Sequence, residues 1–350
     1  MNNEEIKAKL LFNPNGDDRV ESRQIIGGNT TNLFNLNETK YTWAKSLYRK
    51  MLADFWIPEK VNLSQDKIDY NSKLNSTEKK IMKKILSFLT FLDSIQVNNI
   101  PRVSEFITAP EVNTILSIQD FQEVIHSQSY AYIIESVIPS NEREQVYEEW
   151  RSDNILFERN KYIANIYQKF WHDKTMANFL EVIIANYILE SLYFYNGFIF
   201  FYNLASRNLM LGTADEIRYI QSDEYSHISI FANIINEIKN EFPDLIDNQL
   251  IYDMFRIGCQ DEIKWSNHIL KDSDIIGLNE TNTELYTKYL VNDRLLRIGL
   301  EPLFPEANTN PYSSLELQSD SNSSTVKSNF FESKNTNYSI STAIKGWDKI

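Results

Sequence analysis

The sequence predicts an all-α protein, and three observations lead to this prediction. Nine Gly and nine Pro in 350 residues are few, whereas turn-rich β folds use more of both. Apolar residues recur at the helical period of 3.6 residues from Lys40 to about Phe304. Four long segments carry the strongest pattern and are expected to form the helices of one bundle. A chain of this length can bury a large core without disulfides or structural metals.

Three of the four segments are amphipathic. The first is expected to be helical over residues 77–99, with Ser76 or Thr77 as its N-cap. Its inward stripe is formed by Ile85, Leu89, Leu92 and Ile95. The second covers residues 110–137 and has a proline at its start. The fourth covers residues 214–240, and its inward-facing side chains are Ile217, Ile220, Phe231, Ile234 and Ile238.

The third segment, residues 176–204, is apolar on nearly every face. A transmembrane helix has the same character. The polar residues within it and the absence of a positively charged flank favour the central helix of a large bundle instead; these residues are Glu190, Asn186, Asn196 and Asn203. We therefore expect no membrane association.

Composition limits the function classes and the domain organisation. The net charge of −13 argues against a nucleic-acid footprint or a surface for anionic membranes. The single cysteine, Cys259, excludes an intramolecular disulfide and a dithiol redox cycle. No signal-peptide pattern opens the chain, so a cytoplasmic location is expected. Residues 1–39 are polar and predict an N-terminal arm, residues 40–305 the helical domain, and the Ser/Asn-rich residues 306–350 a flexible tail.

Two of the four histidines follow a glutamate by three residues. These pairs are Glu123 with His126 and Glu224 with His227. Positions i and i+3 of a helix lie on one face about a turn apart. Each pair can therefore chelate one metal ion.

Two isolated carboxylates complete the pattern. Asp93 and Glu190 lie on apolar helical surfaces, where a bare carboxylate is very costly to bury. The four helices thus alternate between a single carboxylate and a Glu-x-x-His pair along the chain. This order is typical of ferritin-like di-iron or di-manganese bundles. Four carboxylates and two imidazoles suit iron or manganese. The predicted ligands are Asp93, Glu123, His126, Glu190, Glu224 and His227. The alternative interpretation is two buried ion pairs and two unrelated acids.

A tyrosine accompanies these ligands. Tyr130 lies four residues after His126 on the same helical face, which places its phenol about one turn from the metals. Phe194, Phe198 and Ile220 are expected to enclose it in a dry pocket. The alternative is a structural core tyrosine bonded to a buried carboxylate.

Five segments together resemble the small, radical-generating subunit of class I ribonucleotide reductase. They are FWIPEKVNLSQDKIDY (55–70), FLDSIQ (91–96), EVIHSQSY (123–130), LESLYFY (189–195) and IRYIQSDEYSH (217–227). The resemblance covers about residues 40–310 in order and spacing and extends to the tail. It implies a homodimeric, ferritin-like oxidoreductase subunit for deoxyribonucleotide biosynthesis and DNA replication. It also implies that the chain is active only with the large, catalytic subunit.

The resemblance assigns the first three ligands in the chain to the metal nearer Tyr130 and the last three to the second metal. It implies that Tyr130 carries a stable tyrosyl radical, generated with oxygen or a derived oxidant. Two iron ions are expected, with manganese as the alternative. Manganese would imply a small flavoprotein activase as a further partner. The choice between diphosphate and triphosphate substrates belongs to the large subunit.

The resemblance further implies a route for the radical. Trp56 and Asp223 resemble an electron-transfer pair linked through His126. Tyr338 resembles the tail tyrosine that relays the radical between subunits, with Tyr312 as the alternative. The final AIKGWDKI resembles a peptide that docks into the large subunit.

Three other functions fit the sequence less well. A stand-alone ferritin-like di-metal oxidase would lack both the radical tyrosine and the docking tail. An iron-storage protein is usually about half this length. A non-catalytic membrane or scaffold protein would leave the six-ligand pattern unexplained.

Overall fold

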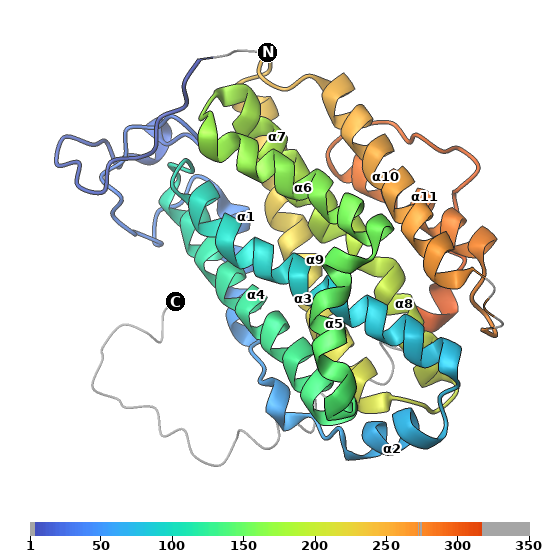
Figure 1. The fold of residues 1–350 in the computed structure, drawn as a ribbon. Helices are drawn as coiled ribbons and strands as arrows, with labels where there is room; N and C mark the ends of the chain where they lie inside the picture. Colours follow the sequence, from blue (N-terminus) through green and yellow to red (C-terminus); the bar gives the residue numbers. More distant parts are fainter. Residues whose placement is uncertain (1–3, 272, 274, 317–350) are drawn as a thin grey trace, which may run out of the picture.

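The computed structural model describes residues 4–271, 273 and 275–316, and within these ranges it contains eleven α-helices and no strand (Figure 1). The prediction of an all-α fold is confirmed. The helices are α1 (Thr42–Ala53), α2 (Ser64–Ser72), α3 (Ser76–Ser104), α4 (Pro110–Val137), α5 (Ser140–Ser152), α6 (Asn154–His172), α7 (Met176–Ile188), α8 (Tyr195–Ser206), α9 (Leu211–Glu241), α10 (Asn248–Leu270) and α11 (Glu280–Arg297). Two short 3₁₀ turns, Val20–Ser22 and Pro58–Lys60, lie near the N-terminus.

The long helices form a bundle around one apolar core. Helices α3 and α4 run side by side, while α10 and α11 pair on the opposite side of the molecule (Figure 1). Helix α9 packs against both α4 and α7. Its five predicted inward residues are fully buried, as are Ile85, Leu89 and Leu92 of α3. Ile95 of the predicted stripe is only partly buried.

Helix α3 begins one residue earlier than predicted, and its N-cap is Asn75 rather than Ser76 or Thr77. The Asn75 side chain accepts a hydrogen bond from the backbone N–H of Glu78, and the Glu78 carboxylate accepts one from the Asn75 N–H. This reciprocal capping box satisfies two backbone donors that the first turn of a helix leaves free. The prediction was wrong because it considered only hydroxyl caps.

The third predicted helix is interrupted. Helix α7 ends at Ile188, residues Leu189–Tyr193 form a π-helical turn, and α8 begins at Tyr195. A π turn changes the direction of the side chains that follow it and is frequent at functional sites. By length and composition the stretch Met176–Ser206 could cross a membrane, but its most apolar window is completely buried inside the protein. It is therefore the central segment of the bundle.

Helix α9 begins where a buried aspartate covers its N-terminus. Asp66 of α2 accepts hydrogen bonds from the backbone N–H groups of Gly212 and Thr213. A side chain at Gly212 would lie 2.8 Å from the carbonyl oxygen of Asn62, so only glycine allows this approach. The contact fixes the register of the helix that carries two of the predicted ligands.

The described residues include 306–316, the beginning of the predicted tail. Tyr312 is buried, and its hydroxyl lies 3.0 Å from the Thr283 hydroxyl of α11. Tyr286 donates a hydrogen bond to Glu316. The folded body therefore extends about ten residues beyond the predicted boundary, to the end of the described residues.

Candidate metal centre

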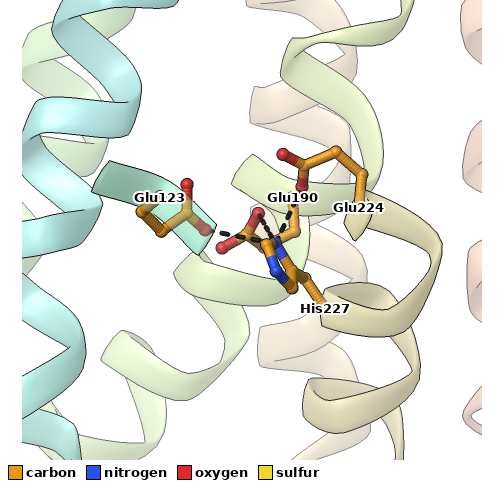
Figure 2. A group of neighbouring side chains, drawn as sticks. All are labelled: Glu123, Glu190, Glu224 and His227. Atoms are coloured by element: carbon orange, nitrogen blue, oxygen red, sulfur yellow. Dashed lines mark hydrogen bonds and ion pairs between the residues drawn. The ribbon is translucent and has the colours of Figure 1, made fainter. Parts of the chain in front are cut away.

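Six side chains from four helical segments converge in the centre of the bundle. Helix α3 supplies one of them, α4 two, the π turn one and α9 two. All six are fully buried: Asp93, Glu123, His126, Glu190, Glu224 and His227. These are the ligands that the sequence spacing predicted. Figure 2 shows four of them, Glu123, Glu190, Glu224 and His227, pointing toward one another.

Both histidines direct their Nδ1 atoms into the cluster. His126 Nδ1 lies 3.2 Å from Glu224 Oε1 and 3.5 Å from Glu123 Oε2. His227 Nδ1 lies 3.2 Å from Glu123 Oε1 and 3.3 Å from Glu224 Oε2. Each of these two glutamates therefore lies between the two imidazoles. Both carboxylates would be available as ligands to a metal held by either histidine.

The ligand atoms form two overlapping groups. Asp93, Glu123 and His126 offer atoms that lie within 4.8 Å of one another. Glu123, Glu190, Glu224 and His227 form a second group by the same measure (Figure 2). Glu123 belongs to both groups, so the two groups are adjacent.

The donor atoms of this cluster fit a pair of divalent cations. Both oxygens of Asp93, both of Glu123 and one each of Glu190 and Glu224 are buried without a hydrogen-bond partner. No lysine or arginine among the described residues forms an ion pair with these carboxylates. Uncompensated buried carboxylates are very costly. Two divalent ions would neutralise four carboxylates, and this oxygen-rich donor set suits iron or manganese.

Electrostatics in the cluster favour bound protons when no cation is present. Burial, followed by the charge of Glu123, raises the pKa of Asp93 and of Glu190 well above the usual range. Burial alone would lower the pKa of His126 and His227, but the facing carboxylates raise it well above its ordinary value. Divalent ions would replace these protons and restore the charge balance.

Asp223 lies behind the cluster and contacts two of the predicted residues. The indole Nε1–H of Trp56 donates a 2.8 Å hydrogen bond to Asp223 Oδ2. His126 Nε2 lies 3.2 Å from the same oxygen. The resemblance led us to expect both contacts, and both are present. A carboxylate behind a ligating histidine fixes the orientation of its ring.

Three glutamines that the sequence pattern did not single out line the cluster. Gln119 donates a 2.8 Å hydrogen bond to Glu190 Oε1, and Gln96 donates to the same oxygen. The hydroxyl of Tyr167 donates to Gln96 at 2.9 Å. Gln122 lies between Asp223 and His227. Helical spacing could have found them, since each lies three or four residues from a predicted ligand or next to one.

Tyr130 is fully buried one helical turn after His126. Burial, and next the charge of Asp93, raise the pKa of its phenol well above the ordinary value. Its hydroxyl has no well-formed hydrogen bond among the described residues. The three residues predicted to enclose it, Phe194, Phe198 and Ile220, are also fully buried. Phe194 and Phe198 stack at 6.0 Å between ring centroids.

Tyr338 and the final apolar peptide lie outside the described residues. Tyr312, the alternative relay tyrosine, packs into the folded body. The relay role of the tail therefore stays a prediction.

Comparison with known proteins gives concordant matches over nearly the whole chain. Residues 33–311 match the family model described as ribonucleotide reductase, small chain. The ribonucleoside-diphosphate reductase subunit beta of Treponema pallidum is 44% identical over 342 residues, which cover 97% of each chain. That of Halalkalibacterium halodurans is 35% identical over 350 residues, covering 99% of this chain and 100% of the relative. The solved R2 subunit of Clostridium botulinum superposes with a TM-score of 0.87 at 44% identity, covering 90% of this chain and 99% of that one.

Proposed function

Because the chain belongs to the ribonucleotide reductase small-chain family, we propose that its six buried ligands hold a dinuclear metal centre that oxidises Tyr130. The chain is the small subunit of a ribonucleoside-diphosphate reductase, which converts ribonucleotides to deoxyribonucleotides. The observation that carries the proposal is the convergence of four buried carboxylates and two imidazoles with no neutralising lysine or arginine.

Two iron ions are the proposed occupants, and manganese with a flavoprotein activase is the alternative. When bound, the metal pair supplies the oxidising equivalent, with oxygen or a derived oxidant. Asp93, Glu123 and His126 would hold the ion nearer Tyr130, and the ligands from the π turn and α9 would hold the second ion. The oxygen-rich donor set supports either metal.

Oxidation of Tyr130 also requires a place for its proton. The raised pKa of this phenol means that it is neutral before oxidation, so an electron and a proton must both leave. After burial, the charge of the Asp93 carboxylate contributes most to the raised pKa of the Tyr130 phenol. We therefore propose that the Asp93 carboxylate, which would be ionised with the metals bound, accepts this proton. The metal pair, when bound, would take the electron.

Trp56 is proposed to carry the oxidising equivalent toward the partner. Its indole N–H is fixed on Asp223, and its ring lies 6.4 Å between centroids from that of His126. Trp56 also lines a surface pocket of about 410 Å³ with Phe55 and Phe121. This position between the buried cluster and the surface supports a role in transfer.

Small subunits of this family pair with a large subunit and form homodimers. The one cysteine, Cys259, is buried, and burial raises its pKa to about 12. A single cysteine cannot supply the dithiol that substrate reduction needs. Substrate reduction then takes place on the large subunit. We propose that the tail, with Tyr338 and the final apolar peptide, docks there, and that the complex is cytoplasmic. Deletion of residues 339–350 would then abolish complex formation and spare radical formation.

Metal analysis combined with EPR on the full-length protein tests the proposal. We expect two iron or manganese ions per chain and a tyrosyl radical signal after oxidation. Element analysis separates iron from manganese. A protein that takes up no metal, or that shows no radical in either metal form, would contradict the proposal.

A further inference from the structure

The side chain of Gln122 connects the two halves of the metal centre. It is 4% exposed and lies next to the ligand Glu123 on α4. Its Nε2 atom donates a 2.9 Å hydrogen bond to Asp223 Oδ1. Its Oε1 atom lies 3.1 Å from His227 Nε2. Both ends of the amide are therefore engaged with residues of α9.

Only one orientation of this amide satisfies both neighbours. Asp223, when ionised, only accepts hydrogen bonds, so it must face the NH₂ group of Gln122. The amide oxygen then faces His227 Nε2, which must carry a hydrogen to donate. A neutral imidazole has one hydrogen on its two nitrogens. In the neutral form of His227, which is the form that ligates a metal, the Nδ1 atom facing the carboxylate cluster therefore keeps its lone pair.

The same amide also orients Asp223. With Oδ1 held by Gln122, the other oxygen, Oδ2, faces both the indole of Trp56 and His126 Nε2. An unbroken hydrogen-bonded chain thus runs from His227 through Gln122 and Asp223 to His126 and Trp56. It connects the outer nitrogen atoms of both ligating histidines.

We propose that Gln122 is a positioning residue that fixes His227 as a metal ligand and aligns Asp223 with Trp56 and His126. It touches neither metal nor substrate in this role. The inference rests on the ligand set proposed above, and it adds that the occupancy of the second metal position depends on a neutral amide outside that set. Outer partners of ligating histidines commonly change metal affinity by roughly 10- to 100-fold.

Three variants of the full-length chain separate the hydrogen bonds from simple packing. Gln122→Met keeps the size and removes both hydrogen bonds. Gln122→Glu has the same shape, and in its protonated form it can donate to Asp223 and accept from His227. Gln128→Met is the matched control, because Gln128 is exposed on the same helix and donates to Glu59, away from the cluster.

The measurement is a Mn(II) titration of metal-free protein, with EPR detecting free, isolated bound and paired Mn(II). The wild type and Gln128→Met should bind two ions per chain and show the signal of a coupled pair. In Gln122→Met we expect one ion to bind roughly 10- to 100-fold more weakly, so that isolated Mn(II) replaces the coupled pair. Gln122→Glu should restore most of the lost affinity.

The outcomes distinguish this inference from the proposed function. If the wild type does not bind two ions, the proposed metal centre itself is wrong. If the wild type binds a pair and Gln122→Met binds it equally well, the positioning role is refuted. Equal weakening in the Met and Glu variants would also refute it, because a side chain of the same shape that can form both hydrogen bonds would then restore nothing. If Gln122→Met fails to fold, as judged by circular dichroism, affinity in Gln122→Glu decides: wild-type affinity supports the role, and loss of the pair refutes it.

Discussion

Trp56 and His126 meet at a single atom, Oδ2 of Asp223, which lies 2.8 Å from the indole Nε1 and 3.2 Å from the imidazole Nε2. This shared oxygen joins a residue near the surface to a residue of the buried cluster. The carboxylate oxygen connects the indole of Trp56 to the imidazole of His126 without direct contact between the two rings. The arrangement separates two tasks, because the ligands face inward while the transfer path begins on the outer side of His126.

Asp223→Asn should separate radical formation from radical transfer. Either orientation of the new amide loses a contact: with its oxygen in the Oδ2 position its NH₂ group faces the NH₂ group of Gln122, and with its NH₂ group there both Trp56 and His126 lose their acceptor. We expect metal loading and the Tyr130 radical to persist, while reductase activity with the large subunit falls roughly 10- to 100-fold. EPR and turnover assays on the same sample measure the two quantities. Asp215→Asn on the same helix is the control and should retain activity, and unchanged turnover in Asp223→Asn would contradict the path.

Tyr130→Phe should keep both metal ions and lose the tyrosyl EPR signal together with reductase activity. The substitution removes only the hydroxyl, which has no well-formed hydrogen bond, so folding and metal uptake should be unaffected. Tyr167→Phe is a matched control, because Tyr167 is a second buried tyrosine linked to the cluster through Gln96. The control should keep the signal. A radical that survives in Tyr130→Phe would place it on another residue.

The sequence was sufficient to predict the convergence of the six ligands, because charged groups on apolar helical faces carry an energetic cost that is visible in the pattern. Asp93 and Glu190 were recognised in this way. The neutral amides of Gln96, Gln119 and Gln122 carry no such energetic signal, since glutamine is common on helices. Gln96 and Gln119 acquire their roles from the packing of α3 and α4 against the π turn, and Gln122 acquires its role from the packing of α4 against α9. Their functions depend on contacts between residues far apart in the chain.

Two further structural features, the π turn and the packing of the chain after residue 306, could not be predicted from the sequence pattern. The π turn at Leu189–Tyr193 arises from a local shift in hydrogen bonding, whereas the apolar pattern of residues 176–204 gives no sign of an interruption. The Ser/Asn-rich composition after residue 306 predicts a flexible tail and gives no indication that Tyr312 packs against α11. Composition describes the average of a segment, and one buried aromatic side chain can keep part of such a segment folded.

Glu190→Gln should lower metal content from two ions per chain to one or none. The substitution removes an anionic ligand from a cluster in which four carboxylates balance the proposed charge of two cations. Element analysis after metal loading measures the effect. Glu216→Gln is the control, because Glu216 is equally buried on α9 but belongs to neither ligand group. Full occupancy in Glu190→Gln would remove this residue from the ligand set.

Glu216 should also make the stability of the protein depend on pH. Its side chain is fully buried, and both carboxylate oxygens lack a hydrogen-bond partner. Burial, and next the charge of Asp66, raise its pKa from the ordinary 4.5 to about 9. Between these values the folded protein keeps the proton and the unfolded chain releases it. Folding therefore takes up a proton, and the free energy of unfolding should fall as pH rises, by up to about 1.4 kcal/mol per pH unit.

Glu216→Gln should remove this dependence, because the amide is neutral in both states. We expect the variant to be more stable than the wild type above pH 6, with a gap that widens toward pH 8.5. Thermal unfolding midpoints measured across this range for both proteins test the expectation, and metal-free samples avoid a contribution from bound ions. Parallel profiles for the two proteins would mean that Glu216 is ionised in the folded state, with a neighbouring group or water compensating its charge.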